Sequence, residues 1–586
     1  MMRLLLPALL LAVATPAQAA PAAEIEPSII VRARVLRQEV PQVLPRSERD
    51  AFAGIFRAIG QRRFDVAKAG LLALPDRLLT ATAWAQIWLA GGETPSNEAL
   101  AAWLAANADA PQAEKLLIKA RAAGITDLPS LPLTARLQAV AGPASEKPRA
   151  TRGDRAAAQL AADVKPLLDQ DRIAEAEALF RDRRGDLSPE GRTEWQQRLA
   201  WHYYLAGDDK AALRLAGEAA SGAGEWAPMG AWVAGLAAWR SDDCNQAADS
   251  FARTAALARS PELASAGYYW AARADMACGR PYRIAAHLRS AARYGDSFYG
   301  LLAARALGLE PPPENELLSF IKADWNHVAE LPGARRATAL VEIGELGLAD
   351  RELRHLAMIG KAEDHVALTY LAARMSLPAT QYWLAHNAPR GITPPPSVRY
   401  PAPSWEPERG WRVDRSLVFA HALQESRFVT DATSRAGAKG VMQLMPGTAQ
   451  QIARNTGTDS NRLADPSFNI EFGQTYLEQL RDSPWTAGLL PKVIAAYNAG
   501  PGSLRNWQGR LQDKGDPLLF IESIPFAETR HYVEIVLRNY WMYQFGEGET
   551  PESAAALAQG LWPRFPGMPG ASAVRMNSTG TSSGVQ

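Results

Sequence analysis

The sequence predicts an all-α protein in which a superhelix of stacked helical hairpins precedes a helical linker and a second, mainly α-helical domain. Three observations support this fold class. Residues 50–310 are rich in Ala and Leu with helical periodicity, and strand-like alternation is nearly absent from them. Three segments in this half resemble one another, and the densest proline cluster of the chain follows at 387–407. The 586 residues exceed what one hydrophobic core organises, so several domains are expected.

The first 20 residues, MMRLLLPALLLAVATPAQAA, have the pattern of a cleaved secretory signal peptide. Arg3 precedes an apolar run, and small residues at Ala17 and Ala19 end it. The run is too short for a membrane span, and the rest of the sequence holds no apolar stretch of about 20 residues. We therefore expect an exported, periplasmic protein with no transmembrane anchor.

Residues 21–310 are assigned to the helical-repeat superhelix. The similar segments start at Trp201, Ala231 and Ala266, and each combines an aromatic helix, a polar turn and a helix led by paired alanines. The spacing from Asp208 to Asp242 is 34 residues, a loose period typical of tetratricopeptide-like hairpins. We interpret the aromatic residues as packing residues.

Composition excludes several functional classes. The 63 Lys and Arg residues balance the 62 Asp and Glu residues, so a nucleic-acid partner bound mainly through charge is not expected. The two cysteines, Cys244 and Cys278, belong to no CxxC pair or His cluster, and we expect neither a metal site nor a cofactor. They fall on helices that neighbour each other in a hairpin stack. A disulfide is therefore a hypothesis that requires their Cα atoms to lie within about 7 Å.

The remaining boundaries follow from composition. Residues 311–399 are assigned to a helical linker domain, which ends in the proline-rich joint where no helix can continue. A further domain is assigned to residues 400–546. Residues 547–586 are small, polar and rich in Gly, Ser and Pro, and we expect this tail to be disordered.

Four short motifs lie in order within residues 400–546: QESRF (Gln424 to Phe428), GVMQLMP (Gly440 to Pro446), AYNAGPG (Ala496 to Gly502) and IPFAETRHYV (Ile524 to Val533). Each alone has an ordinary structural interpretation, such as a Met-lined packing segment or a helix ended by Gly and Pro. Together they resemble the goose-lysozyme-like catalytic domain of the soluble lytic murein transglycosylases. The helical half also looks like the large periplasmic members of that family, by architecture more than by motif.

The resemblance implies a site residue at each matching position. It makes Glu425 the catalytic acid/base and implies that substrate is contacted, or the site supported, by Ser434, Gln443, Met445, Tyr497, Asn498 and Glu528. Two residues depart from the family pattern. His421 stands where the family is expected to have an apolar residue, and Leu423 stands where it is expected often to have a basic one. These departures concern helix packing and substrate preference.

The chemistry of the residues agrees with this assignment. A carboxyl group donates a proton to a glycosidic oxygen near neutral pH only when an apolar environment raises its pKa. Usual glycosidases need a second carboxylate. Asp431 sits in a polar loop, and Glu528 is the better candidate for proximity. Without an evident nucleophile, we expect the substrate's own N-acetyl group to attack the anomeric carbon. His421, four residues before Glu425, either tunes the acid or is a packing or surface residue.

The resemblance therefore implies a lyase that cleaves the MurNAc–GlcNAc β-1,4 bond of peptidoglycan glycan strands and forms 1,6-anhydro-MurNAc ends. Amide and hydroxyl side chains suit this nearly neutral polymer. Two alternatives stay open: a lysozyme-type hydrolase on the same fold, and a non-catalytic periplasmic scaffold that binds glycan. The superhelix is also a candidate surface for partners from the cell-wall machinery.

Overall fold

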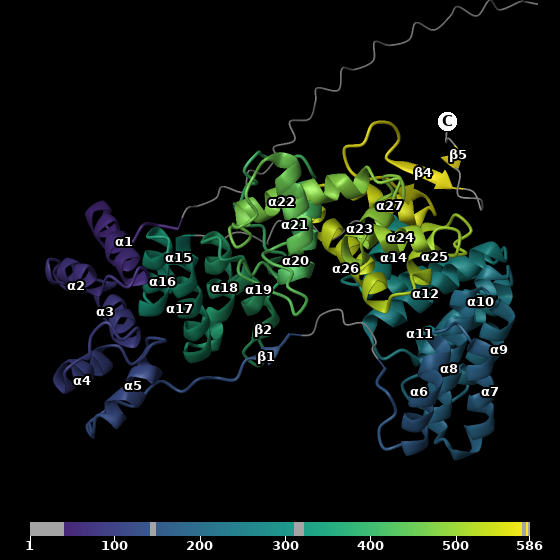
Figure 1. Cartoon of the computed structure of the whole chain (residues 1–586), viewed down its shortest axis with the longest axis horizontal. Coiled ribbons are helices and arrows are strands. Elements are labelled where there is room, and N and C mark those ends of the chain that lie inside the picture. Colours follow the sequence, from purple (N-terminus) through teal and green to yellow (C-terminus); the bar gives the residue numbers. More distant parts are fainter. Residues whose placement is uncertain (1–39, 141–147, 310–321, 577–581, 584–586) are drawn as a thin grey trace, which may run out of the picture. The chain divides into compact units, whose positions relative to one another are not determined.

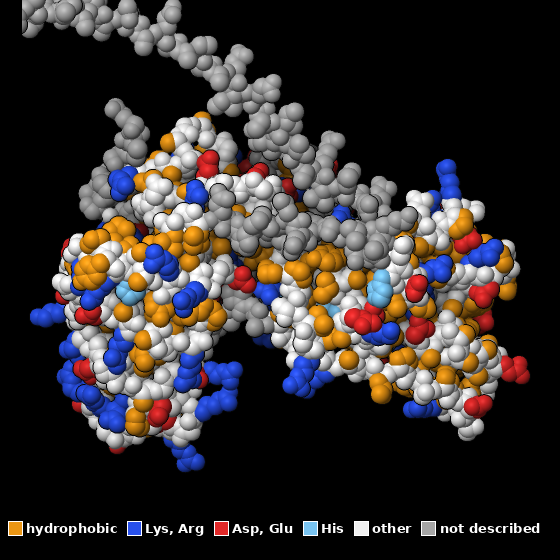
Figure 2. Space-filling model, turned by 180° about the vertical axis from the view of Figure 1, so that it is seen from behind, with side chains coloured by type: hydrophobic (Ala, Val, Ile, Leu, Met, Phe, Trp, Pro, Cys, Tyr) orange, Lys and Arg blue, Asp and Glu red, His pale blue; other side chains and the backbone are white. Residues whose placement is uncertain are grey.

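The computed structural model describes residues 40–140, 148–309, 322–576 and 582–583 (Figure 1). Within these ranges the chain forms helices α1 to α27 and only five short strands, so the prediction of an all-α protein is confirmed. The predicted signal peptide, residues 1–20, lies outside the described residues. None of the described helices is both long enough and apolar enough to cross a membrane. Side chains of both charges are interspersed over the face shown in Figure 2.

The first five helices share one hydrophobic core with five helices that follow residue 321. These are α1 (Arg46–Gly60), α2 (Phe64–Leu72), α3 (Thr80–Leu89), α4 (Asn97–Ala106) and α5 (Ala113–Ala122), with α15 (Lys322–Val328), α16 (Pro332–Glu342), α17 (Leu346–Ile359), α18 (His365–Arg374) and α19 (Pro378–His386). Arg336 joins the two groups through Asp109, at 2.9 Å. The boundary assigned at residue 310 therefore separates helices that share one core. The sequence does not reveal this, because the helices after residue 321 pack against helices more than 200 residues earlier in the chain.

The central helices stack as hairpins in which each helix packs on its sequence neighbours. They are α6 (Arg155–Leu168), α7 (Ile173–Arg183), α8 (Pro189–Ala206), α9 (Asp209–Ala220), α10 (Ala227–Arg240), α11 (Cys244–Leu257), α12 (Pro261–Ala277), α13 (Pro281–Ala292) and α14 (Phe298–Ala306). Asp208 and Asp243 cap α9 and α11 by accepting from backbone N–H groups. Small residues permit close approach, since a Cβ on Gly267 would lie 2.6 Å from the nitrogen of Ala255.

The structure joins Cys244 and Cys278 in a disulfide. Cys244 begins α11 and Cys278 caps the C-terminal end of α12, and their Cα atoms are 5.6 Å apart. The bridge therefore ties two consecutive, packed helices together at the end of a hairpin.

The last third of the chain contains the helices that carry the four motifs. They are α20 (Arg415–Ser426), α21 (Pro446–Thr456), α22 (Pro466–Arg481), α23 (Leu490–Ala499), α24 (Pro501–Trp507), α25 (Pro517–Ser523), α26 (Ala527–Gly546) and α27 (Glu552–Ala558). Short elements complete the described chain: 3-10 turns at Arg184–Asp186, Ala362–Asp364 and Pro396–Arg399, β1 (Gln138–Ala139) antiparallel to β2 (Asn387–Ala388), and β3 (Trp562–Pro563), β4 (Ala573–Met576) and β5 (Ser582–Ser583) in order β3-β4-β5.

A loop of this last third, residues 508–516, lies against three successive hairpins of the stack. Its contacts fall at regular steps along both segments: Gln512 lies over Gly207, Lys514 pairs with Asp242 at 2.7 Å, and Asp516 pairs with Arg273 at 2.6 Å. The helices on both sides of this contact contribute to one continuous hydrophobic core.

The expectation that residues 547–586 are disordered is wrong for 547–576. Helix α27 packs on α14, and Trp562 is only 1% exposed, with its indole N–H donating to the carbonyl of Gly515 at 2.7 Å. The ammonium of Lys492 lies over the same ring, 5.0 Å from its centroid. The average composition of this segment hides a few large apolar residues, and their burial on an existing core is sufficient to order it.

Candidate active site

Helix α20 places Glu425 in its last turn. Asp414 caps the start of the helix by accepting from the N–H groups of Ser416 and Leu417. The helix ends at Ser426, and the next residue, Arg427, adopts the left-handed conformation with φ of 54°. Residues 416–423 are all buried, so the helix is fixed in the core while its final turn reaches the surface of the domain.

The turn of the GVMQLMP motif is fixed against the end of α20. Ser426 donates its hydroxyl to the carbonyl of Val441 at 2.8 Å. Asn469 of α22 accepts from the N–H of Met442 at 2.8 Å and donates to the carbonyl of Lys439 at 3.1 Å. Because a Cβ on Gly440 would lie 2.1 Å from the amide nitrogen of Asn469, only glycine fits at the start of this motif.

Within the described part of the chain, the carboxyl group of Glu425 has one direct hydrogen-bond donor, the hydroxyl of Tyr532 on α26, at 2.6 Å from Oε1. Burial raises the pKa of Glu425 to about 7, the hydrogen bond from Tyr532 opposes this rise, and the negative charge of Glu528 adds to it. A large fraction of Glu425 therefore carries a proton at neutral pH.

The Tyr-Asn pair of α23 is held by two separate contacts. Tyr497 is buried and donates its hydroxyl to the carbonyl of Met442 at 2.9 Å, which links α23 to the GVMQLMP turn. Thr529 donates to the side-chain oxygen of Asn498 at 2.6 Å. This contact directs the oxygen of Asn498 into the protein, so its amide nitrogen is the group left for a ligand. Glu528, beside Thr529, is exposed.

The other predicted contact residues lie in one hydrogen-bonded loop. Ser434 accepts from the N–H of Ala438 at 3.0 Å, and its hydroxyl hydrogen remains available to donate. Gln443, with φ of 47°, donates from its amide nitrogen to the carbonyl of Gly440 at 2.8 Å, which leaves the amide oxygen as its free polar atom. Met445 ends the loop with a side chain that is 45% exposed.

His421 proves to be a fully buried packing residue. Its Nδ1 donates to the carbonyl of Leu417 at 2.9 Å, and its ring centroid lies 4.8 Å from that of Tyr497 and 6.1 Å from that of Tyr532. Burial lowers the pKa of His421 to about 4, so the ring is neutral at neutral pH. Leu423, the second departure from the family pattern, is also buried.

Three residues of the site were not among the sequence predictions: Tyr532, Thr529 and Asn469. Tyr532 and Thr529 lie inside the IPFAETRHYV motif, and Tyr532 is one helical turn after Glu528, so the sequence contained a signal for both. Asn469 lies in none of the four motifs, and no local pattern distinguishes it from an ordinary helical asparagine. Only the tertiary contact with the GVMQLMP turn reveals its role.

The comparisons with known proteins address the domain and the fold separately. Residues 404–520 match the family model described as Transglycosylase SLT domain. The soluble lytic murein transglycosylase of Escherichia coli (strain K12) is 36% identical over 155 residues, which covers 26% of this chain and 24% of that protein. A putative soluble lytic murein transglycosylase of Haemophilus influenzae is 35% identical over 144 residues, with 24% of each chain covered. The matched segment thus spans about a quarter of these curated relatives.

Two solved structures align with most of the chain. The 70 kDa soluble lytic transglycosylase of Escherichia coli superposes with a TM-score of 0.53 at 19% identity, over 89% of this chain and 99% of that chain. An inactive mutant of the lytic transglycosylase Slt of Pseudomonas aeruginosa superposes with a TM-score of 0.51 at 22% identity, over 86% and 81%. At these identities the likeness concerns the fold. The predicted resemblance is confirmed, and the chain carries a Transglycosylase SLT domain within the fold of the soluble lytic transglycosylases.

Proposed function

We propose that the chain is a lytic transglycosylase that cleaves the β-1,4 bond between N-acetylmuramic acid and N-acetylglucosamine in peptidoglycan. The observation that carries this proposal is the partly buried Glu425 at the end of α20, which accepts a hydrogen bond from Tyr532 and whose pKa burial raises to about 7. Lytic action on murein is what the names of the matched relatives describe. The matched residues 404–520 include Glu425 and the GVMQLMP and AYNAGPG motifs, which supports the proposal.

In the first step, Glu425 donates its proton to the oxygen that leaves with the N-acetylglucosamine. The carbonyl oxygen of the muramic acid N-acetyl group forms a bond to the anomeric carbon as the glycosidic bond breaks. Tyr532 then stabilises the newly formed carboxylate through its 2.6 Å hydrogen bond to Oε1. Among the described residues, Glu528 is the only other carboxylate whose charge acts on Glu425, and its exposed position suits support more than nucleophilic attack.

In the second step, the carboxylate of Glu425 accepts the proton of the C6 hydroxyl on the same muramic acid. The C6 oxygen attacks the anomeric carbon, the bond to the N-acetyl oxygen breaks, and a 1,6-anhydro ring forms. The reaction consumes no water, and Glu425 is protonated again at its end. A tethered nucleophile competes with water through its high effective concentration.

The surroundings of Glu425 support the exclusion of water that this route requires. Met442, Tyr497 and Tyr532 are buried, and all three belong to the hydrogen-bonded frame around the carboxyl group. The side chains left to meet the substrate are an amide on Asn498, an amide oxygen on Gln443 and a hydroxyl on Ser434. These groups suit N-acetylated sugars. Export to the periplasm and docking of cell-wall machinery on the helical stack are further parts of this proposal.

The decisive experiment is product analysis by mass spectrometry of isolated sacculi treated with the purified protein. We expect muropeptides with 1,6-anhydro ends, each one water lighter than a hydrolysis product. The Glu425→Gln variant is the control, because it keeps the volume and polarity of the side chain; its rate should fall by about two to four orders of magnitude. Reducing ends as the main product would identify a hydrolase, and binding without cleavage would identify a glycan-binding scaffold.

A further inference from the structure

Helix α22 forms a seat for the turn of the GVMQLMP motif. Asn469 lies on this helix, is completely buried, and uses both atoms of its amide. Its oxygen accepts from the N–H of Met442 at 2.8 Å. Its nitrogen donates to the carbonyls of Lys439 at 3.1 Å and Leu463 at 2.9 Å. One side chain therefore satisfies three backbone groups that belong to two separate segments.

Gly473, one turn further along α22, shapes the same seat. A Cβ at this position would lie 2.0 Å from the sulfur of Met442, so the side chain of Met442 lies directly against the backbone of α22. Met442 is itself fully buried. Asn469 and Gly473 are four residues apart and therefore share one face of the helix. Helix α22 thus holds Met442 both by its backbone and by its side chain.

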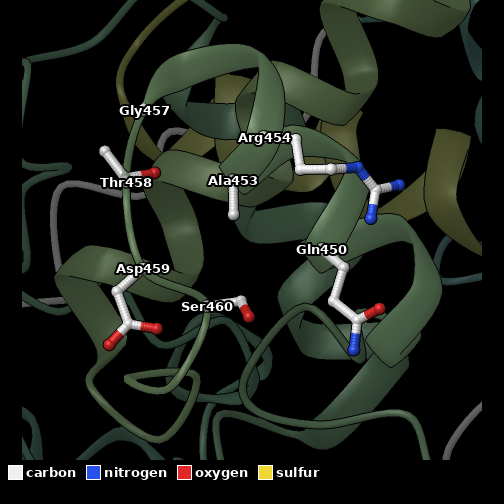
Figure 3. Close-up of a pocket in the computed structure, with 7 residues that line it drawn as sticks. All are labelled: Gln450, Ala453, Arg454, Gly457, Thr458, Asp459 and Ser460. Atoms are coloured by element: carbon white, nitrogen blue, oxygen red, sulfur yellow. The ribbon is translucent and has the colours of Figure 1, made fainter.

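Helix α21, which follows the turn, is open on one side. A cavity of about 310 Å³ lies there, with Gln450 and Arg454 on the helical side and the loop from Gly457 to Ser460 opposite them (Figure 3). This loop is tied to the motif further along the chain, where the carbonyl of Leu463 accepts from Asn469. Asn469 therefore joins the loop, the turn and α22 at one point.

The seat is connected to Glu425 through Tyr497. The hydroxyl of Tyr497 donates to the carbonyl of Met442 at 2.9 Å. Burial raises the pKa of Tyr497, and the negative charge of Glu425 raises it further, because the two side chains lie close together. Ser426, next to Glu425 in the chain, donates to the carbonyl of Val441 at 2.8 Å. The backbone around Met442 is therefore part of the wall beside the acid.

We infer that Asn469 is a positioning residue that decides whether the C6 hydroxyl or a water molecule attacks the anomeric carbon. This inference rests on the proposed function, because it takes the muramic acid to react at Glu425. With Asn469 in place, its three backbone partners are satisfied without water. Without the amide, the N–H of Met442 and the carbonyls of Lys439 and Leu463 would be buried and unpaired, and such groups bind water where there is room for it. Water at the seat would loosen the turn and open the wall beside Glu425.

The competing step differs from the anhydro route only in its nucleophile. A water molecule attacks the anomeric carbon, the bond to the N-acetyl oxygen breaks, and the carboxylate of Glu425 accepts a proton from that water. The muramic acid then keeps a free reducing end. Because unfolded molecules form neither product, the ratio of the two products reports the exclusion of water from the site and does not depend on the stability of a variant.

The ratio of anhydro to reducing ends in muropeptides released from sacculi by the purified protein tests this inference. We expect anhydro ends to predominate in the wild type. In Asn469→Ala the share of reducing ends should rise about three- to tenfold, because a small displacement removes much of the advantage of a tethered nucleophile. Asn469→Ser keeps one hydroxyl for the same backbone groups. It should show a smaller rise, and it decides the question if Asn469→Ala does not fold.

Gln474→Ala is the matched control. Gln474 is equally buried on the same helix, and its amide also bonds backbone groups, but those of Gly410, Arg412 and Val413, which precede α20. This variant should lose stability and keep the product ratio of the wild type. An unchanged ratio in the folded Asn469 variants, or an equal rise in Gln474→Ala, overturns the role of Asn469 and leaves the proposed function standing. Reducing ends as the main product of the wild type would overturn the proposed function, and this inference with it.

Discussion

At the scale of single residues, the acidity of Glu425 on α20 depends on its hydrogen bond with Tyr532 on α26. Burial favours the protonated form of Glu425, while the hydroxyl of Tyr532 favours the carboxylate that remains after proton donation. The opposing effects leave a pKa of about 7, near which a group both donates and accepts a proton effectively. In the proposed mechanism, one carboxyl group with this pKa serves both steps, and no second catalytic carboxylate is required.

Replacing Tyr532 with Phe should move the pH dependence of activity. The first step of the proposed mechanism requires protonated Glu425, so kcat/KM of the wild type should fall as the pH rises through about 7. Removal of the hydrogen bond raises the pKa of Glu425, and the falling limb should shift to higher pH by about one unit, with a lower kcat. Tyr543→Phe is the matched control, because Tyr543 is buried on the same helix but donates to the carbonyl of Pro401. If the falling limb of Tyr532→Phe does not shift, the hydroxyl of Tyr532 does not control the pKa of Glu425.

Most of the candidate site could be predicted from the sequence, because the four motifs contain most of its residues. The sequence did not predict how those residues are held. The neutral, buried state of His421 depends on Tyr497 and Tyr532, which come from two distant helices. The position of Met442 depends on Asn469, which no motif includes.

At the scale of elements, the disulfide joins α11 to α12 and closes a segment with a sequence separation of 34 residues. In the chain-entropy model, closing such a loop in the unfolded chain stabilises the folded protein by about 3 to 4 kcal/mol. We expect Cys278→Ser to lower the free energy of unfolding of the helical stack by this amount, as measured by urea denaturation without reductant. Reduced wild type and reduced variant should unfold alike. Equal midpoints for the variant and the oxidised wild type would contradict a stabilising bridge.

The helices of the stack follow from their periodicity and caps, which are local properties of the sequence. The packing of α15 to α19 against α1 to α5 is different, because it joins segments more than 200 residues apart, as in the pair Arg336 and Asp109. The ordered tail is a similar case. Its composition is that of a disordered segment, and Trp562 becomes structural only because Lys492 and Gly515 provide a site for its ring.

At the scale of the whole molecule, one buried and one partly buried carboxyl group lie where the helical stack meets the catalytic domain. Glu522 of α25 accepts a hydrogen bond from the hydroxyl of Tyr299, and Glu262 of α12 pairs with Arg538 at 3.2 Å. Burial is the main cause that raises the pKa of Glu522 to about 8 and that of Glu262 to about 7; the charge of Glu534 raises both further. This contact therefore binds protons more tightly than the unfolded chain does.

Stability should accordingly fall as the pH rises from about 5 to 8. The folded pKa of Glu522 lies above its ordinary value of 4.5, so the folded state holds a proton that the unfolded state has lost, and this advantage decreases with rising pH. Glu522→Gln keeps an acceptor for Tyr299 and removes the titration, so its melting temperature should decline less over this range. Glu406→Gln, at an exposed glutamate, should decline like the wild type. Parallel curves for Glu522→Gln and wild type would show that Glu522 does not titrate at this contact.

The loop at 508–516 also constrains how the helical array can change in length. Repeat arrays commonly gain or lose whole hairpins, because each unit contacts only its neighbours. Here Lys514 faces Asp242 and Asp516 faces Arg273, one hairpin apart. Loss of the α10–α11 hairpin would remove Asp242, the partner of Lys514, and would shorten by one hairpin the distance that the loop spans to reach Arg273. The contacts of the loop therefore fit only one number of hairpins between α8 and α12. Whole hairpins could be gained or lost without disturbing these contacts on the α6 side of the array.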